Sequence, residues 1–238
     1  MKYLGSKARI SDQIVKIVQA ERRPGQVYVE PFLGGANVIH KVSGERIAGD
    51  LSPYVATLWN AVANGWTPPQ VVTESVYAKL KRDRWEDPLT AYAGFAMSFG
   101  GKFFGGYRRD KAGTKGCPEN EKTQSRRSYN SMVKQASGMA GVRVFNCGYE
   151  DLPIPANSLI YCDPPYAGTT GYHVGPFDSA AFYKWAEDKV NEGHTVFVSE
   201  YTAPDHWDKV WEKPMNRTLC NNAGGRRGTE RLFRVVPS

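Results

Sequence analysis

The sequence predicts an α/β fold with a mostly parallel sheet, a small helical insertion and an antiparallel hairpin near the C-terminus. First, short apolar segments alternate with amphipathic helical stretches at both ends of the chain. Second, residues 66–140 break this alternation with helical stretches around a glycine-rich basic segment. Third, the chain has 238 residues, 41% of them hydrophobic, which suits one domain with a buried core. We therefore expect residues 1–65 and 141–238 to form one core that residues 66–140 interrupt.

The first part of the core is predicted to open with a helix and continue as strand, turn and helix. The helix has apolar residues at helical spacing, a cap at Ser11 or Asp12 and a stop at Pro24-Gly25. After it we expect a strand at 26–32, a glycine turn at 33–37 that opens a two-turn helix through Val42, a strand at 46–50 and a helix at 54–65.

The remaining elements follow the same reasoning. The insertion is predicted to contain helices at 71–84, 90–98 and 128–139. The core then resumes with strands at 142–146 and 158–162, a helix at 180–192 and a strand at 195–201. Two strand-like pieces, at 216–220 and 229–236, are joined by a polar turn and predict a hairpin at the sheet edge.

The formal charge of the chain is +7, and its basic residues are concentrated in the insertion. Residues 102–134 carry nine basic and three acidic residues, and they include the aromatic residues Phe103, Phe104, Tyr107 and Tyr129. Seven glycines lie between Gly94 and Gly116. Basic, aromatic and glycine-rich composition suits a surface that binds a nucleic-acid backbone, although a solvated charged face is the alternative interpretation.

Several protein classes are excluded or disfavoured. No apolar run approaches the length of a membrane span, and the N-terminus has no apolar signal region. The four Cys and four His residues are scattered without metal-site spacing. We therefore expect a cytoplasmic protein with free thiols, no membrane contact and no metal.

The glycine turn predicts a ligand site. Gly34-Gly35 directly follows a buried strand, where the backbone approaches a ligand closely. Asp50 ends the next strand and is placed to accept hydrogen bonds from ribose hydroxyls. The complete GxGxxG pattern of dinucleotide sites is absent, so the turn by itself indicates only a nucleoside ligand.

The segment Asp163-Pro164-Pro165-Tyr166 is the sharper signal. It follows a continuous apolar strand, and strand ends of open α/β sheets are where ligands bind. Two prolines fix the backbone, so the carboxylate and a carbonyl become acceptors at set positions beside an aromatic face. Such a group suits a planar ring with an amino group. A rigid turn in which Asp163 caps and Tyr166 packs is the alternative.

Together these motifs resemble a known family. KYLGSK, VEPFLGGANV, GDLSPY and CDPPY, in this order, are similar to the Dam-type (D12 class) DNA adenine-N6 methyltransferases, and VFVSEY and TERLF to phage-borne members. The resemblance implies a class I, Rossmann-like fold that depends on S-adenosyl-L-methionine (AdoMet). It implies methyl transfer to N6 of a flipped adenine in double-stranded DNA, leaving S-adenosyl-L-homocysteine. We expect such an enzyme to be a monomer or weak dimer in a bacterium or phage-infected host cell, where it would either protect phage DNA from restriction or mark host DNA.

The resemblance also implies roles for single residues. Tyr3 and Lys7 would contact AdoMet, with Tyr3 standing where the family usually has Trp. The cofactor loop would consist of Phe32, Gly34 and Gly35, with Glu30 near the methionine group and Asp50 on the ribose. Asp163, which also lines the cofactor site, and the Pro164 carbonyl would accept the two N6 hydrogens. Pro165 would hold the turn, and Tyr166 would stack on the base.

Two departures from the family leave questions open. The family often has an acid near the cofactor adenine after the strand at 142–146, but residues 146–149 contain none; Tyr149 is the predicted substitute. The insertion has FFGGYRR where the family has a different sequence motif. Arg108 or Arg109 in this segment could recognise a guanine or bind a phosphate. We expect Arg108, Arg109, Arg126 and Arg127 to bind DNA. An RNA or cytosine-N4 methyltransferase, or a non-catalytic DNA-binding module, remains the alternative function.

Overall fold

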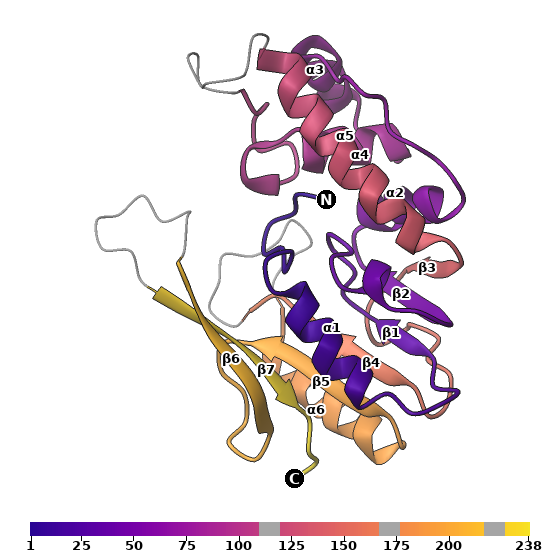
Figure 1. Cartoon of the computed structure of the whole chain (residues 1–238), viewed down its shortest axis with the longest axis vertical. Coiled ribbons are helices and arrows are strands. Elements are labelled where there is room, and N and C mark those ends of the chain that lie inside the picture. Colours follow the sequence, from indigo (N-terminus) through magenta and orange to yellow (C-terminus); the bar gives the residue numbers. More distant parts are fainter. Residues whose placement is uncertain (110–119, 167–176, 217–226) are drawn as a thin grey trace.

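A computed structural model describes residues 1–109, 120–166, 177–216 and 227–238 (Figure 1). Its centre is a seven-stranded sheet with the strand order β3-β2-β1-β4-β5-β7-β6. The strands are β1 (Tyr28–Glu30), β2 (Arg46–Asp50), β3 (Val142–Asn146), β4 (Leu159–Cys162), β5 (Thr195–Glu200), β6 (Asp208–Asn216) and β7 (Arg227–Arg234). Strands β1 to β5 pair in parallel, and β7 pairs antiparallel with both β5 and β6. The predicted α/β class with a C-terminal antiparallel hairpin is therefore confirmed.

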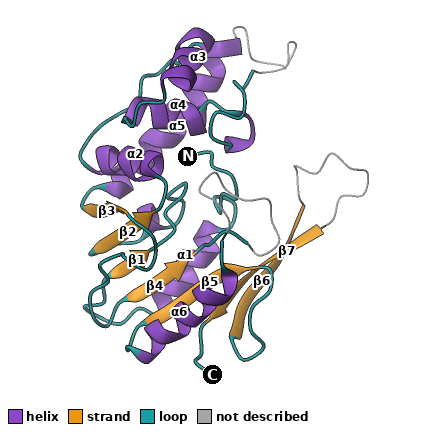
Figure 2. Ribbon diagram, turned by 180° about the vertical axis from the view of Figure 1, so that it is seen from behind, coloured by secondary structure: helices purple, strands orange, loops and turns teal. Residues whose placement is uncertain are grey.

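Helices cover both faces of the sheet. Figures 1 and 2, seen from opposite sides, place α1 (Ser11–Ala20) and α6 (Ser179–Asn191) on opposite faces. Strand β4 shows why: Leu159 and Tyr161 belong to the buried cluster that includes α1, whereas Ile160 and Cys162 belong to the cluster that includes α6. Side chains alternate across a strand, so a strand covered on both faces is apolar throughout.

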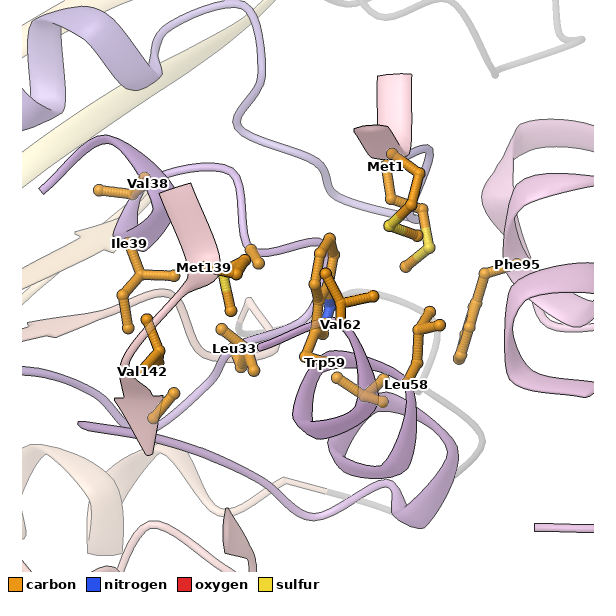
Figure 3. Packing of buried hydrophobic residues seen from close by; sticks show 14 of the residues in the cluster. Met1, Leu33, Val38, Ile39, Leu58, Trp59, Val62, Phe95, Met139 and Val142 are labelled. Atoms are coloured by element: carbon orange, nitrogen blue, oxygen red, sulfur yellow. The ribbon is translucent and has the colours of Figure 1, made fainter. Parts of the chain in front are cut away.

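The remaining helices pack onto the core. They are α2 (Pro53–Ala63), α3 (Glu74–Asp83), α4 (Pro88–Ala96) and α5 (Asn120–Met139), with single 3₁₀ turns η1 (Ile39–Lys41) and η2 (Phe99–Gly101). Figure 3 shows Leu58 and Trp59 of α2 beside Leu33 and Met139 in one buried cluster. The segment 66–140 thus shares its hydrophobic core with the sheet. No helix in the described ranges is long and apolar enough to cross a membrane.

Two local predictions are wrong. The two-turn helix expected after the glycine turn is only η1, because Gly34 and Ala36 adopt positive φ and leave too few residues for an α-helix. Neither Ser11 nor Asp12 caps α1: the N-cap is Ile10, which makes no side-chain cap hydrogen bond, and the Ser11 hydroxyl donates to the Ala8 carbonyl.

Strand β6 was not predicted, and the strand expected at 216–220 lies almost wholly outside the described residues. The sequence of β6, DKVWEKPMN, has charges along its length and a proline opposite Thr229. Charges and proline are typical of an edge strand, and β6 is the last strand of the sheet. An edge strand of this kind lacks the apolar pattern from which strands are predicted.

A close approach between α5 and η1 gives a testable prediction. A Cβ atom on Gly138 would lie 1.9 Å from the His40 carbonyl oxygen, a fixed backbone atom. Gly138→Ala in a free helix would stabilise by about 1 kcal/mol, but here we expect a loss of about 2–4 kcal/mol in the free energy of unfolding. Urea denaturation measures it, with Ser137→Ala on the exposed side of α5 as the control. A stabilised Gly138→Ala variant would contradict this packing.

Candidate functional site

A pocket of about 300 Å³ lies at the carboxyl ends of the parallel strands. Glu30 ends β1, Asp50 ends β2 and Asp163 follows β4, so strands far apart in the sequence bring three carboxyl groups to one edge. The pocket is also lined by the N-terminal segment 3–7 and by residues 148–151 after β3. The structure brings together all the residues predicted to bind a cofactor: Tyr3, Lys7, Glu30, Phe32, Gly34, Gly35, Asp50 and Asp163.

The glycine turn is held in place from several sides. Gly34 has φ +45°, and a Cβ there would lie 2.9 Å from the Tyr3 ring. The Trp59 indole N–H of α2 donates to the Gly34 carbonyl at 2.8 Å. Gln135 of α5 donates to the Gly35 carbonyl at 3.0 Å. The turn therefore depends on α2 and α5 as well as on its own sequence, and Trp59 and Gln135 are supports that the motif did not reveal.

Asp50 links the turn to the start of α2. Its Oδ2 accepts from the Gly34 backbone N–H at 2.8 Å, and its Oδ1 accepts from the Ser52 N–H at 2.9 Å. Burial raises the pKa of Asp50 to about 6, while these two hydrogen bonds oppose the shift. Each carboxylate oxygen has a second lone pair, so the group retains acceptor capacity for a hydroxyl in the pocket.

Glu30 is a buried acid on the pocket floor. It is 3% exposed, and its Oε1 accepts a hydrogen bond from the Tyr28 hydroxyl at 2.7 Å. Burial raises the pKa of Glu30 to about 8, with the negative charge of Asp163 as a further cause. Near neutral pH the side chain is therefore mostly protonated, and a positive charge entering the pocket would favour its ionised form.

The raised pKa of Glu30 predicts a pH dependence of stability. Between its ordinary value of 4.5 and its folded value of about 8, the folded chain keeps a proton that the unfolded chain has released. The contribution of Glu30 to the free energy of unfolding is therefore fully present below pH 4.5. It declines from pH 4.5 upward and is lost as the pH rises through about 8. We expect Glu30→Gln to remove roughly 3 kcal/mol of the decline in unfolding free energy between pH 5 and pH 8.5. Denaturant titrations at several pH values test this, with exposed Glu86→Gln as control; parallel wild-type and Glu30→Gln curves would contradict it.

Aromatic side chains form one wall of the pocket. Phe32 stacks on Tyr149 with ring centroids 5.4 Å apart and an interplanar angle of 29°. Phe177 contacts Phe32 edge-on at 5.8 Å. Tyr149, the predicted substitute for the missing acid, therefore lies in the pocket. Phe177 was not predicted as a pocket residue, because its local sequence has no feature that indicates a ligand site apart from its position just before α6.

The tetrad after β4 is part of a charged network. Lys7 Nζ lies 2.8 Å from Asp163 Oδ1 and 3.7 Å from Glu230 Oε2, and it also donates to the Gly5 carbonyl at 3.2 Å. Burial alone would lower the pKa of Lys7, but the charges of Asp163 and Glu230 outweigh it and raise the pKa. The Lys7 ammonium, expected on the cofactor, thus pairs with the tetrad acid while it still lines the pocket.

Tyr166 is held by a second acid. Its hydroxyl donates to Glu230 Oε2 at 2.8 Å, its ring meets Tyr201 edge-on at 4.4 Å, and Lys7 Nζ lies 4.5 Å from the ring centroid. Pro165 lines the pocket, and Pro164 is buried. Glu230 belongs to the TERLF segment, 64 residues after Tyr166 in the chain. The sequence therefore gave no reason to expect its contact with the tetrad.

The four candidate DNA-binding arginines lie on the helical segment but differ in their surroundings. Arg126 and Arg127 are exposed on α5. Arg109 forms an ion pair with Glu74 of α3, in which Nε donates to Oε2 at 3.0 Å. Arg108 is half-buried, and its backbone N–H donates to the Met97 carbonyl at 2.8 Å.

The sheet order and the pocket define a class I methyltransferase fold: a parallel sheet with one antiparallel strand inserted between β5 and β6, and a nucleoside-sized pocket at the carboxyl ends. In the described parts of the chain, no group of three or more His, Cys, Asp or Glu residues is arranged to hold a metal ion.

Comparisons with known proteins agree with this class. Residues 3–96 match the family described as D12 class N6 adenine-specific DNA methyltransferase. The chain is 23% identical over 264 residues to the DNA adenine methylases of two Vibrio cholerae serotype O1 strains, covering 98% of this chain and 94% of each relative. The family match over residues 3–96 and the two adenine methylase relatives agree with the resemblance predicted from the motifs.

Two solved structures also match most of this chain. The rRNA methyltransferase AviRa from Streptomyces viridochromogenes matches with a TM-score of 0.43 and 11% identity over 98% of this chain and 86% of that chain. SMU.472, a putative methyltransferase complexed with SAH, matches with a TM-score of 0.38 and 10% identity over 98% of this chain and 54% of that chain. At these scores neither likeness bears on the substrate.

Proposed function

We propose that the chain transfers the AdoMet methyl group to N6 of an adenine flipped out of double-stranded DNA. The observation that carries the proposal is that the tetrad acid Asp163 lines the same pocket as the glycine turn and Asp50. A base receptor and a nucleoside receptor thereby share one cavity, as direct transfer between two bound reactants requires.

The pocket's chemistry fits AdoMet. Asp50 offers acceptors to ribose hydroxyls, and Glu30 and Asp163 offer carboxyl groups to a cofactor that carries positive charge. Phe32 and Tyr149 offer aromatic faces to its adenine. When bound, AdoMet supplies a methyl group activated by the adjacent sulfonium. The volume of about 300 Å³ is at the lower end of ordinary ligand pockets.

The tetrad would act on the base. Adenine N6 is a weak nucleophile because its lone pair is delocalised into the ring. The Asp163 carboxylate and the Pro164 carbonyl would each accept one N6 hydrogen, which favours a more tetrahedral nitrogen with an available lone pair. Burial raises the pKa of Asp163, and Lys7 at 2.8 Å opposes this shift, so the ammonium favours the carboxylate form that acts as an acceptor. Stacking on Tyr166 would offset part of the cost of extruding the base.

We assign DNA binding to the inserted segment 66–140 and the catalytic core to residues 1–65 and 141–238. The support is the basic, glycine-rich composition of residues 102–134 and the exposed arginines Arg126 and Arg127 on α5. Arg108 is connected to α5 through its guanidinium, which donates to the Ser128 hydroxyl at 3.5 Å, and Arg109 follows it in the chain. We further propose that the enzyme works in the bacterial cytoplasm, as a monomer or weak dimer.

The DNA surface can be tested through its salt dependence. Neutralising Arg126 and Arg127 to Gln should weaken binding to unrelated DNA sequences equally and reduce the slope of log affinity against log salt by about 2. Fluorescence anisotropy with a labelled duplex at several salt concentrations measures the slope. Arg143→Gln on β3, exposed and outside the segment 66–140, is the control. An unchanged slope in the double variant would show that DNA binds at another surface of the protein.

The reaction itself is tested by transfer of a radiolabelled methyl group from AdoMet to DNA, followed by digestion to nucleosides and chromatography. The proposal predicts label in N6-methyldeoxyadenosine. Label in N4-methyldeoxycytidine, or transfer only to RNA, would establish an alternative enzyme of the same fold. DNA binding without transfer to any nucleic acid would point to a non-catalytic module.

A further inference from the structure

Glu230 lies on the hairpin strand β7, outside the pocket and outside every motif with an assigned role. Its partner across the hairpin is Lys213 of β6, and its side chain is 17% exposed. Side chains alternate along a strand, so Glu230 shares its face with Leu232, which is buried in the cluster that contains α1 and Tyr161. The hairpin therefore carries a carboxylate into the protein on the side of the tetrad.

The contacts of Glu230 connect two groups of the tetrad site. Its Oε2 accepts the Tyr166 hydroxyl hydrogen at 2.8 Å and lies 3.7 Å from Lys7 Nζ. Lys7 in turn lies 2.8 Å from Asp163. One ammonium thus stands between two carboxylates, and one of these carboxylates also fixes the tetrad's aromatic ring.

A partly buried carboxylate in an ion-pair network is a costly way to stabilise a fold. Removing charges from water costs several kcal/mol per ion, and apolar residues of similar size are often equally stabilising. The position does suit preorganisation: without Glu230, the Tyr166 hydroxyl and the Lys7 ammonium would both be left with Asp163 as their carboxylate partner. The ammonium would then compete more strongly for the oxygen that a substrate amino group needs.

We propose that Glu230 is a positioning residue for methyl transfer, which fixes the Tyr166 ring and shares the Lys7 charge so that Asp163 is free to accept a hydrogen bond from the target base. The inference rests on the proposed function and extends it to a residue on the hairpin. It requires that Glu230 affect the transfer step and leave cofactor binding unchanged, since Glu230 does not line the pocket.

The experiment compares Glu230→Ala, Glu230→Gln and the control Glu212→Gln, an exposed glutamate on the neighbouring strand β6. Single-turnover rates of methyl transfer to duplex DNA are measured at saturating AdoMet, and AdoMet affinity is measured by calorimetry. We expect Glu230→Ala to slow transfer about 10–100-fold with AdoMet affinity within twofold of wild type. Glu230→Gln, which retains an acceptor for Tyr166, should lose less, and Glu212→Gln should match wild type.

A double-mutant cycle with Tyr166→Phe separates positioning from a general structural effect. If Glu230 acts through the Tyr166 hydroxyl, the double variant Tyr166→Phe/Glu230→Ala should be no more than about threefold slower than the slower single variant. If the rate losses of the two single variants multiply fully in the double variant, or if Glu230→Ala transfers within twofold of the wild-type rate, the inference about Glu230 is overturned. Either result leaves the proposed function standing. Absence of transfer by the wild-type enzyme would overturn the proposed function, and the inference with it. Because Glu230→Gln is isosteric, it keeps the test valid if the alanine variant fails to fold.

Discussion

Replacing Asp163 with alanine is expected to reduce methyl transfer by about 10³-fold or more while the protein remains folded. In the proposed mechanism, the variant removes the acceptor for one N6 hydrogen from the pocket lining. It also leaves Lys7, which is 7% exposed, with Glu230 at 3.7 Å as its remaining acid partner. The buried ammonium retains a counter-charge, so we expect a modest loss of stability beside a near-complete loss of activity.

Single-turnover transfer rates and thermal unfolding of Asp163→Ala and Asp163→Asn test this expectation. Asparagine preserves the shape and one acceptor oxygen but turns an amide donor toward Lys7 or the base, so it should also be severely impaired. Asp205→Ala, which removes an exposed acid remote in sequence, is the matched control. A turnover rate in Asp163→Ala within tenfold of the wild-type rate would show that the tetrad acid is not required for methyl transfer.

Replacing Asp50 with alanine is expected to weaken AdoMet binding about 10–100-fold. The carboxylate would provide the ribose acceptor, and it also holds the Gly34 and Ser52 backbone N–H groups at 2.8 and 2.9 Å. Its loss therefore removes a ligand contact and loosens the turn that shapes the pocket. Asp50→Asn keeps only one acceptor oxygen for these two donors and should fall between the alanine variant and wild type.

Calorimetric titration with AdoMet measures the effect of Asp50, with Asp151→Asn, an exposed acid at the pocket rim, as the control for charge alone. Affinity within twofold of wild type in Asp50→Ala would exclude the ribose role. Equal losses in Asp50→Ala and Asp151→Asn would instead indicate a general electrostatic attraction of the cofactor.

Much of the site was predictable because a parallel sheet places its carboxyl ends along one edge. Strand β1 with its glycine turn, β2 with Asp50 and β4 with Asp163 are each visible in the sequence, and the fold alone brings them together. The continuous apolar run of β4 likewise identified a strand covered on both faces.

The unpredicted features depend on contacts between distant segments. Glu230 reaches Tyr166 only because β7 is inserted between β5 and β6, a pairing that no local pattern specifies. Gln135 supports the glycine turn from a helix 100 residues away. The expected helix after that turn did not form because Gly34 and Ala36 adopt positive φ, which an α-helix does not contain.

The most direct test of the account is expression of the chain in a bacterium without DNA methylation of its own, followed by sequencing that reports modified bases. The account predicts N6-methyladenine at one recurring sequence in cells with the wild-type chain or Asp205→Ala, and none in cells with Asp163→Ala. N4-methylcytosine in place of N6-methyladenine, or unmodified DNA in cells that contain the folded wild-type protein, would contradict it.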